Sequence, residues 1–488
     1  GNPEQLQRVL GDLWRSDTGE YGAIPRLDEF EDAHLFSDRR PLKAMEYRLF
    51  AQQAFTDWAL ALRAVIAETG GGAQLVMVGQ DEGGTMDRPS PMFFAPAVDI
   101  GSIHNWWFND DILWDSIVTR APGKAHLVQE SGVMMYERAD GLPWRSEEEV
   151  ARLLERKLTV SLGAGSIGYV HWLWNSNPWM PSDNEAAIGA LRADGSAKPE
   201  YDVLRRLNAF IGKHHAHFRG RRNEHTVLIL PHANQFSVRG TAVRASKAAL
   251  RALAYGCRLP VRAMSEQRLH ASLTDARLLL LPHPSSFSEE AWSRLLEAVR
   301  SGATMLVTGV IDRDEHWREL PRSTRLRAGM RIRPVSPYET IRIDDEVHVC
   351  GYRGEDLQRI DTQSPREAEV VELVETRLGE GRLLWCPVPV ELSDNPAAIV
   401  ALYRYAMDKA DLHAPVTLQP STPGVLALVS AFERCTLITL ISERSDDCRI
   451  TVRLRKPSFS DDVRLPAGTA LLLLVDGEGE LIASTARH

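Results

Sequence analysis

The segment "HLVQESGVMMY", His126 to Tyr136, decides the fold prediction, because it begins as an apolar strand and then reaches the carboxylate of Glu130. Ser131 and Gly132 follow directly. A buried carboxylate without a partner is costly, so Glu130 needs either an ion-pair partner or a chemical role. In a parallel α/β barrel the carboxyl ends of the strands build the active site, which favours catalysis. Its position alone leaves both interpretations open.

Three other apolar runs of strand length surround this segment, and helical runs lie between or before them. The runs of strand length are "AQLVMVG" (73–79), "AVDIGSIHNWW" (97–107) and "IGYVHWLWN" (167–175). The helical runs are 41–68, in which apolar residues recur at spacings of three and four, and 146–165. Apolar strands that alternate with helices predict a parallel sheet covered by helices.

Side chains that suit a sugar follow three neighbouring predicted strands. Glu130 follows one of them; the others are followed by His104, Asn105, Trp106 and Trp107, and by His171, Trp172, Trp174, Asn175, Asn177 and Trp179. Sugars have apolar CH faces and a rim of hydroxyl groups, which aromatic and hydrogen-bonding side chains match. Because alternate residues of a strand face opposite ways, at most one of Trp172 and Trp174 projects inward. The pattern predicts a carbohydrate site.

The runs "HLVQESG", "GYVHWLWN" and "DGSAKPE" resemble the last strands of the (β/α)8-barrel retaining glycoside hydrolases, the cellulase and β-galactosidase superfamily. The resemblance implies that the chain holds the C-terminal half of a TIM barrel and that Glu130 is the nucleophile. It places Trp174 at the floor of the subsite for the attacked sugar and His104 as a hydrogen-bond partner there. We expect Asn105, Trp106 and the loop carboxylate Glu82 to bind substrate as well.

The acid/base carboxyl group of this family has no clear counterpart in the sequence. A retaining mechanism needs a second carboxyl group about 5 Å from the nucleophile. In the family it follows an Asn at a strand end, and no "NE" follows an apolar strand in the first seventy residues. Glu20 in "TGEYG" and Glu82 in "VGQDEGG" are candidates, but a group outside this polypeptide is the stronger expectation.

Only four of the eight barrel strands are visible in the sequence. Four strands do not close a barrel at this strand tilt, so we expect a separate chain, or residues absent from this numbering, to complete it. The strand ending at Gly79 should then have no neighbour from this chain on the side away from Val98–Ile100.

The sequence divides into three predicted domains. Residues 1–215 form the catalytic barrel portion. Residues 216–415 alternate apolar strands with helices, which predicts a doubly wound, flavodoxin-like α/β domain. They lack a G-x-G-x-x-G and a nucleophile elbow, which favours a structural or oligomerising role. This part resembles the amidotransferase-like trimerisation domain of bacterial β-galactosidases. Residues 416–488 predict a small antiparallel β domain, which resembles their C-terminal domain.

Composition narrows the partners and cofactors. The 488 residues carry a net charge of -9 without a long basic run, so no nucleic acid is expected. The sequence has no apolar run of membrane-spanning length and no signal-peptide pattern, which indicates no membrane partner and a cytoplasmic protein. Five scattered cysteines and the histidines near His214 form no metal-site pattern, so we expect no metal and no cofactor. A disulfide between Cys435 and Cys448 is the less favoured alternative to free thiols.

The sequence therefore predicts a retaining glycoside hydrolase that cleaves β-glycosidic bonds and is β-galactosidase-like. Its expected partners are a carbohydrate substrate and further copies of itself, with a trimer as one form. A carbohydrate-binding or scaffold protein with a degenerate glycosidase site remains the alternative, because the acid/base group is missing.

Overall fold

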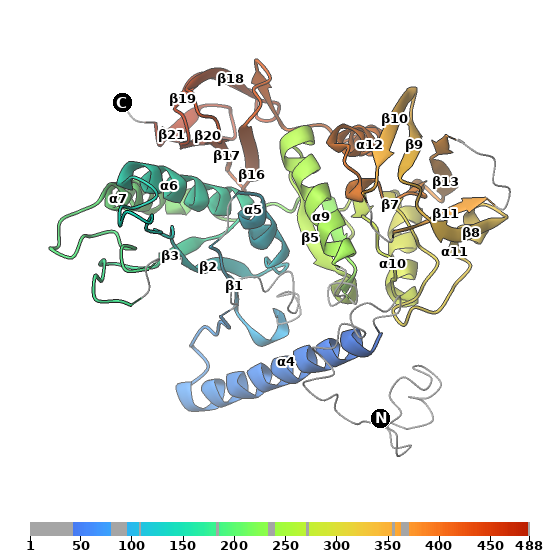
Figure 1. Cartoon of the computed structure of the whole chain (residues 1–488), viewed down its shortest axis with the longest axis horizontal. Coiled ribbons are helices and arrows are strands. Elements are labelled where there is room, and N and C mark those ends of the chain that lie inside the picture. The colour runs from blue at the N-terminus through green and yellow to red at the C-terminus, as the bar shows by residue number, and fades with distance from the viewer. Residues whose placement is uncertain are drawn as a thin grey trace.

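The structure is a computed structural model that describes residues 42–79, 95–106, 109–181, 185–232, 240–269, 273–353, 357–362 and 370–486 (Figure 1). The fold is mixed α/β, with helices packed against several sheets. A parallel N-terminal sheet, a larger middle sheet and a pair of C-terminal antiparallel sheets follow one another along the chain.

The N-terminal sheet is parallel, in the order β1-β2-β3. Helices follow β2 and β3 as the sequence predicts, whereas the helix after β1 lies where the sequence predicts only a loop. Its elements are β1 (Ile100–His104), α5 (Asn109–Val118), β2 (Ala125–Ser131), α6 (Glu147–Ala164), β3 (Gly168–His171) and α7 (Pro199–His214), with a short 3-10 turn, η2 (His215–His217), after α7. Helix α6 begins with a capping box, in which the Ser146 hydroxyl accepts from the Glu149 N–H and the Glu149 carboxylate accepts from the Ser146 N–H.

The predicted strand over 73–79 is reduced to one isolated parallel bridge between Met77 and Ile100. The Val76 carbonyl accepts from the Asp99 N–H at 2.7 Å, but the Val76 N–H donates to the Asp99 carboxylate at 2.8 Å instead of to a backbone carbonyl. This side-chain bond replaces a bond that a regular ladder would use. Among the described residues no other strand pairs with Met77.

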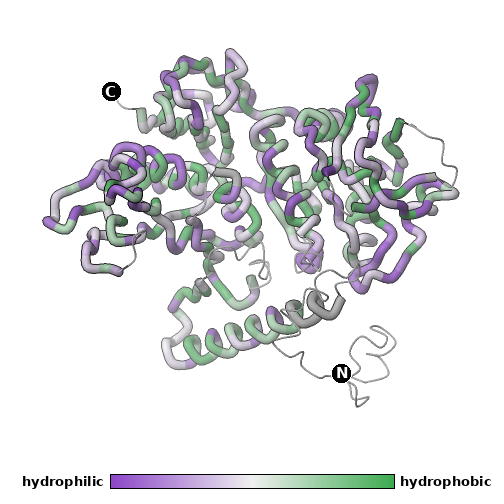
Figure 2. The backbone as a smooth tube through the Cα atoms, in the orientation of Figure 1, coloured by the Kyte–Doolittle hydropathy of each residue, from purple (hydrophilic) through white to green (hydrophobic). Residues whose placement is uncertain are grey.

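Helix α4 (Leu42–Gly70) matches the predicted helix and lies at one side of the molecule, with hydrophobic residues recurring along it (Figures 1 and 2). Over residues 49–70 of this helix the fully buried side chains are Gln52, Thr56 and Ala59, and Arg63 forms an ion pair with Asp99 at 2.5 Å. Its exposed apolar side chains are Phe50, Phe55, Trp58, Leu60, Leu62, Val65 and Ile66. The described chain therefore leaves an apolar helix face uncovered.

The middle sheet has the strand order β13-β14-β7-β6-β4-β5, and only β13 runs antiparallel. The strands are β4 (Thr226–Leu230), β5 (Arg262–Ser265), β6 (Leu278–Leu281), β7 (Thr304–Thr308), β13 (Val374–Leu378) and β14 (Gly381–Cys386). The helices are α9 (Thr241–Arg251), the π-helical η3 (Ala252–Cys257), η4 (Glu266–Arg268), α10 (Glu289–Arg300), η5 (Val390–Leu392) and α12 (Pro396–Lys409).

Both faces of the middle sheet are buried. Leu228 and Leu230 of β4 join an apolar cluster with α9 and α12, whereas Val227 and Ile229 join another cluster with α10. Alternate residues of one strand thus contact helices on opposite faces, which explains the nearly continuous apolar sequence of these strands.

A group of short elements between β7 and β13 does not appear in the sequence-based prediction. It comprises α11 (Arg322–Leu326), β8 (Met330–Pro334), β9 (Tyr338–Ile343), β10 (Glu346–Gly351), β11 (Gln358–Thr362) and β12 (Val371–Glu372). These strands form two small sheets, β10-β9-β12 and β11-β8. Their sequences mix charged and apolar residues over runs of only two to six residues, so periodicity gives little signal.

The C-terminal strands form two antiparallel sheets that share one apolar core. One sheet contains β15 (Val416–Gln419), β18 (Cys448–Leu454) and β19 (Phe459–Leu465), and the other contains β16 (Val425–Ala431), β17 (Cys435–Ser442), β20 (Ala470–Asp476) and β21 (Leu481–Ser484). Leu437 of β17 and Leu472 of β20 face away from that core and pack with Leu154 of α6 and Leu207 of α7. The second sheet therefore covers the helices of the N-terminal sheet.

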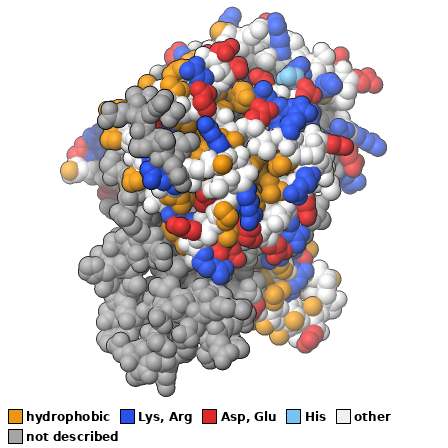
Figure 3. Space-filling model, turned by 90° about the vertical axis from the view of Figure 1, so that its right-hand side faces the viewer, with side chains coloured by type: hydrophobic (Ala, Val, Ile, Leu, Met, Phe, Trp, Pro, Cys, Tyr) orange, Lys and Arg blue, Asp and Glu red, His pale blue; other side chains and the backbone are white. Residues whose placement is uncertain are grey.

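All five cysteines are free, so the Cys435–Cys448 pairing is absent. No helix in the described ranges has the length and apolar character needed to cross a membrane. Acidic and basic side chains are intermingled over the face shown in Figure 3.

Candidate active site

The carboxylate of Glu130 lies at the end of β2 and is contacted by the end of β1. The Trp106 indole N–H donates to Glu130 Oε1 at 3.1 Å, and His104 Nδ1 lies 3.6 Å from the same oxygen. The Asn105 backbone N–H donates to the Glu130 carbonyl at 2.9 Å. The Glu130 side chain is 25% exposed, so it is held by protein on one side and open on the other.

A register shift in β1 explains this geometry. The pairing of β1 with β2 is irregular between Ile103 and His104, so that His104 pairs with Glu130. Side chains two apart on a strand share a face, which agrees with the contacts of both His104 and Trp106 to Glu130. The Asn105 side chain lies between them in sequence, is 1% exposed, and has no hydrogen-bond partner among the described residues.

The side chain of Lys157, on α6, hydrogen-bonds the backbone just beyond the ends of β1 and β2. Its ammonium donates to the Trp106 carbonyl at 2.9 Å and to the Gly132 carbonyl at 2.6 Å, and it lies 5.8 Å from the centroid of the Trp106 ring. Burial, and then the charge of Arg145, lower the pKa of Lys157 to about 7. Lys157 thus fixes the backbone that carries Trp106, the hydrogen-bond donor to Glu130.

Gly132 is required by close packing. A Cβ atom at this position would lie 2.4 Å from the Trp172 carbonyl oxygen and 3.0 Å from the Trp106 ring. The Trp172 N–H also donates to the Ser131 carbonyl at 2.9 Å. These contacts bring Trp172, which is half-buried, beside the strand end that carries Glu130.

Trp174, the aromatic residue expected at the floor of the subsite, lies farther along the same loop. Its side chain is 61% exposed and meets the edge of Tyr201 of α7, with ring centroids 6.0 Å apart. No described hydrogen bond or ring contact joins Trp174 to His104, Trp106 or Glu130.

Two half-buried side chains of β3, Tyr169 and His171, lie beside the strand end that carries Glu130. The Tyr169 hydroxyl donates to the Ser131 carbonyl at 2.8 Å. His171 lies at the end of β3, where burial and then the charges of Lys198 and Lys157 lower its pKa to about 4. His171 is therefore neutral at ordinary pH, and its buried Nε2 has no hydrogen-bond partner in the described part of the chain.

Several predicted site residues lie outside the described ranges, namely Glu20, Glu82 and Trp107. No ion pair or hydrogen bond joins Glu130 to a second carboxyl group among the residues that the structure describes. In the same ranges no three His, Cys, Asp or Glu side chains gather as a metal-binding group. Sequence reasoning missed Lys157; the available signal was a lysine on the otherwise apolar face of a predicted helix.

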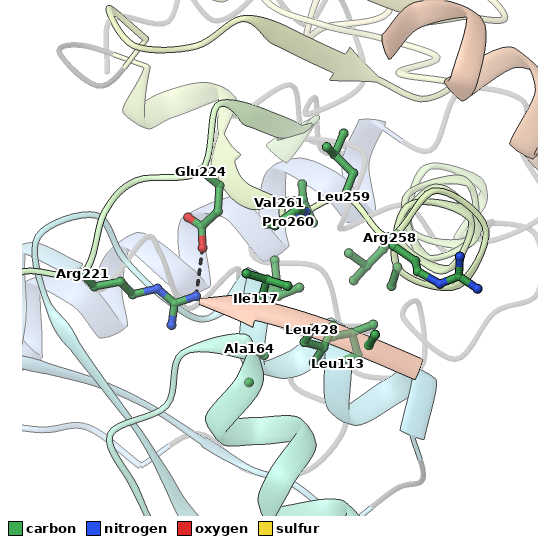
Figure 4. A pocket seen from close by; sticks show the side chains of 15 residues that line it. Leu113, Ile117, Ala164, Arg221, Glu224, Arg258, Leu259, Pro260, Val261 and Leu428 are labelled. Atoms are coloured by element: carbon green, nitrogen blue, oxygen red, sulfur yellow. Dashed lines mark hydrogen bonds and ion pairs between the residues drawn. The ribbon is translucent and has the colours of Figure 1, made fainter. Parts of the chain in front are cut away.

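A small pocket of about 30 Å³ lies elsewhere, where α5, α6, η3 and β16 meet (Figure 4). It has room for about one or two water molecules. At its edge Glu224 accepts from Arg221 at 2.9 Å and from Arg120 at 3.0 Å. The apolar lining and the fully engaged carboxylate make it a packing defect at a junction of elements, not a substrate site.

Comparison with known proteins identifies solved structures with a similar fold. No protein-family profile matches the chain, and no curated protein sequence does. Among solved structures, a catalytic mutant of Gan42B, a GH42 β-galactosidase from G. stearothermophilus, matches with a TM-score of 0.74 and 11% identity, over 97% of this chain and 73% of that one. A β-galactosidase from Bacillus circulans sp. alkalophilus matches with a TM-score of 0.74 and 13% identity, over 96% and 74%.

A third match is the β-galactosidase of the haloarchaeon Halorubrum lacusprofundi, with a TM-score of 0.70 and 14% identity, over 97% of this chain and 74% of that one. The chain thus has the fold of a glycoside hydrolase. More particularly, it shares the fold of the GH42 β-galactosidases over nearly its whole length.

Proposed function

We propose that this protein is a retaining glycoside hydrolase that cleaves β-glycosidic bonds and acts on substrates like those of a β-galactosidase. The observation that carries the proposal is the partly exposed Glu130 carboxylate at a strand end, with Trp106 and His104 at one of its oxygens. The GH42-type fold supports it, because the carboxyl ends of the strands are where active sites lie in such folds.

In the proposed mechanism Glu130 attacks the anomeric carbon of the sugar, and the bond to the leaving-group oxygen breaks. Trp106 and His104 contact Oε1, which leaves Oε2 for the attack. Water then cleaves the glycosyl-enzyme ester and releases the sugar. A second carboxyl group first protonates the leaving group and then activates that water; we place it at Glu20, at Glu82 or outside this polypeptide.

The remaining predicted residues fill the sugar-contact roles. We propose His104 and Trp106 as contacts of the attacked sugar, because both reach the carboxylate. Either Trp172 or Trp174 supplies the aromatic floor, and the backbone contacts of Trp172 to Ser131 and Gly132 favour Trp172. Asn105 has its polar side-chain atoms buried, which suits a supporting role behind Trp106.

We further propose that additional β/α units complete a barrel around this site. The supporting observations are the single bridge at Met77, the parallel three-stranded sheet and the uncovered apolar face of α4. An unpaired sheet edge and an exposed apolar patch are both features that proteins normally cover. The units come from outside the described residues, either from this polypeptide or from another chain.

The experiment that tests the function is turnover of a panel of p-nitrophenyl β-glycosides by the full-length protein and by Glu130→Gln. We expect the substitution to abolish turnover, because the amide cannot form the glycosyl ester, while sugar binding persists. A matched control is Glu137→Gln, an exposed carboxylate in the following hairpin. Near-normal turnover by Glu130→Gln would end the proposal.

A carbohydrate-binding protein with a degenerate site is the second candidate. The observation in its favour is that no second carboxyl group contacts Glu130 among the described residues. It predicts that the wild-type protein binds sugars but turns over none of the aryl glycosides, so the same panel separates the two candidates.

A further inference from the structure

A short hairpin directly follows the strand that carries Glu130, and it displays two aromatic rings. The hairpin is closed by a bridge between Glu137 and Pro143 and by the Arg138 N–H, which donates to the Leu142 carbonyl at 2.8 Å. At its base the Trp144 N–H donates to the Tyr136 carbonyl at 2.8 Å. The rings of these two residues lie 6.4 Å apart, inclined at 54°.

Both arms of the hairpin are anchored, so the two rings are held in place. Val133 and Met135 are buried in the cluster that joins α6 and α7 to the C-terminal strands. On the other arm the capping box at Ser146 fixes the start of α6. Between these anchors the Tyr136 and Trp144 side chains are 40% and 64% exposed.

The hairpin also carries polar groups next to its rings. The Arg145 guanidinium lies 5.0 Å from the centroid of the Trp144 ring. The Tyr136 hydroxyl, on the other arm of the hairpin, donates to Met134 Sδ at 3.2 Å. Apolar ring faces bordered by hydrogen-bond donors match the CH faces and hydroxyl rim of a pyranose.

The hairpin lies within reach of the candidate active site. Tyr136 follows Glu130 by six positions in the sequence, so the chain places their Cα atoms at most about 20 Å apart. The link is also structural, because Lys157 holds the Gly132 carbonyl at the root of the hairpin and the Trp106 carbonyl beside Glu130. The charge of Arg145, at the base of the hairpin, also acts on Lys157 and lowers its pKa.

We propose that Tyr136 and Trp144 form an outer saccharide subsite that binds a sugar unit beyond the one attacked at Glu130. The substrate is then a β-linked oligosaccharide or polysaccharide, not a simple monoglycoside. This inference rests on the proposed function, since it assigns the substrate class of the same site.

The test compares a short and a long substrate in Trp144→Ala. The probes are the p-nitrophenyl β-glycoside that the protein turns over fastest and the β-linked tetrasaccharide of the same sugar. We expect kcat/KM for the tetrasaccharide to fall about five- to tenfold, mainly through KM, because the stacking contact is lost. The aryl glycoside should change less than about twofold, because it does not reach the hairpin.

Leu142→Ala is the matched control, because Leu142 is an exposed apolar residue at the tip of the same hairpin, 56% exposed and outside the ring pair. It should leave both substrates unchanged, and circular dichroism checks that each variant is folded. Equal effects of Trp144→Ala on both substrates, or no effect on either, would overturn the subsite.

A binding measurement separates this inference from the proposed function. Titration calorimetry of Glu130→Gln with galacto-, gluco-, manno- and xylo-tetraose should detect binding of at least one, weakened when Trp144→Ala is added. If one binds in this way but the wild type cleaves nothing, the subsite stands and the hydrolase proposal fails. If none binds at millimolar concentration, the subsite is overturned.

Discussion

At the scale of single residues, the hydrogen bond from Trp106 to Glu130 is the contact that most directly holds the candidate nucleophile. Trp106→Phe removes the 3.1 Å bond and keeps most of the ring. A hydrogen bond to a charged group contributes about 1.5–3 kcal/mol, so we expect kcat/KM for an aryl β-glycoside to fall about 10- to 100-fold. Trp317→Phe, near the middle sheet, should have no effect; an unchanged rate in Trp106→Phe would contradict the assignment.

Lys157 should matter to stability as well as to rate. Lys157→Met leaves the Trp106 and Gly132 carbonyls without their buried donor. An unsatisfied buried polar group costs about 1–3 kcal/mol, so we expect a lower Tm together with a lower kcat. Lys213→Met, at an exposed position on α7, is the control. Equal Tm values for the two variants would show that Lys157 does not join the strand ends.

The decrease in Tm caused by Lys157→Met should also depend on pH. The folded-state pKa of Lys157 is about 7, lowered by burial from 10.5. Between these values the unfolded chain binds more protons at this site than the folded protein, so the Lys157 contribution makes the wild type more stable as pH rises. The variant lacks this contribution. Thermal unfolding at pH 6, 8 and 9.5 should therefore show a Tm difference that widens with pH.

The sequence predicts part of this site and misses the rest for identifiable reasons. Glu130, His104 and Trp106 stand out because each follows an apolar strand, and the structure brings them together. Which of Trp172 and Trp174 lies beside Glu130 depends on the irregular pairing of β2 with β3 between Val128 and Ser131. Such an irregularity leaves no periodic signal in the sequence. The position of Asn105 is also not predicted by periodicity. Its sequence neighbours His104 and Trp106 lie on the face toward Glu130.

At the scale of elements, helix α4 offers the clearest test of barrel completion. Trp58 is 56% exposed in the described part of the chain, and our proposal covers it with a further β/α unit. Trp58→Ser should then cost about 2 kcal/mol, the value for a buried large apolar side chain, and lower the Tm by several degrees. The control is Trp179→Ser, because Trp179 is 91% exposed on a loop. If both variants keep the wild-type Tm, the α4 face is open to solvent and the barrel proposal fails.

Elements differ in how well their sequences predict them. The long helices α6 and α7 and the buried strands β4, β6 and β7 of the middle sheet have apolar patterns from which their sequences predict them, and the structure contains them. The buried strands β5 and β14 of the same sheet are not predicted. The segment 73–79 has the same apolar character but forms only one bridge. A strand needs neighbours on which to form its ladder, and its own sequence does not supply them.

At the scale of the whole molecule, Glu224 joins segments that are far apart in sequence. It accepts from Arg120, next to α5, and from Arg221, and its backbone carbonyl accepts from Arg262 of β5. Glu224→Gln leaves two half-buried guanidinium groups without a counterion; the cost for a fully buried pair, about 3–5 kcal/mol, is the upper bound. We expect the Tm to fall by about 5 °C or more. The control is Glu290→Gln, which breaks the exposed ion pair with Arg294 and should change the Tm little.

The contribution of the Glu224 ion pairs to stability should disappear in acid. Burial alone would raise the pKa of Glu224, but the charges of Arg120 and Arg221 outweigh it and leave the pKa below its ordinary value of 4.5. A carboxyl group with a lowered folded-state pKa stabilises the protein above pH 4.5, and the stabilisation is lost as pH falls through the folded value. The Tm difference between wild type and Glu224→Gln should thus narrow below pH 4.5. A constant difference would mean that Glu224 acts through packing alone.

The central claim is that Glu130 is a nucleophile, and covalent trapping tests it most directly. An activated 2-deoxy-2-fluoro β-glycoside forms the glycosyl ester with little help from an acid and releases it slowly. Incubation of the full-length protein followed by peptide mass spectrometry should find one added fluoroglycosyl group on Glu130, and none in Glu130→Gln. A label on another carboxylate, or no label on a protein that cleaves the parent glycoside, would contradict the account.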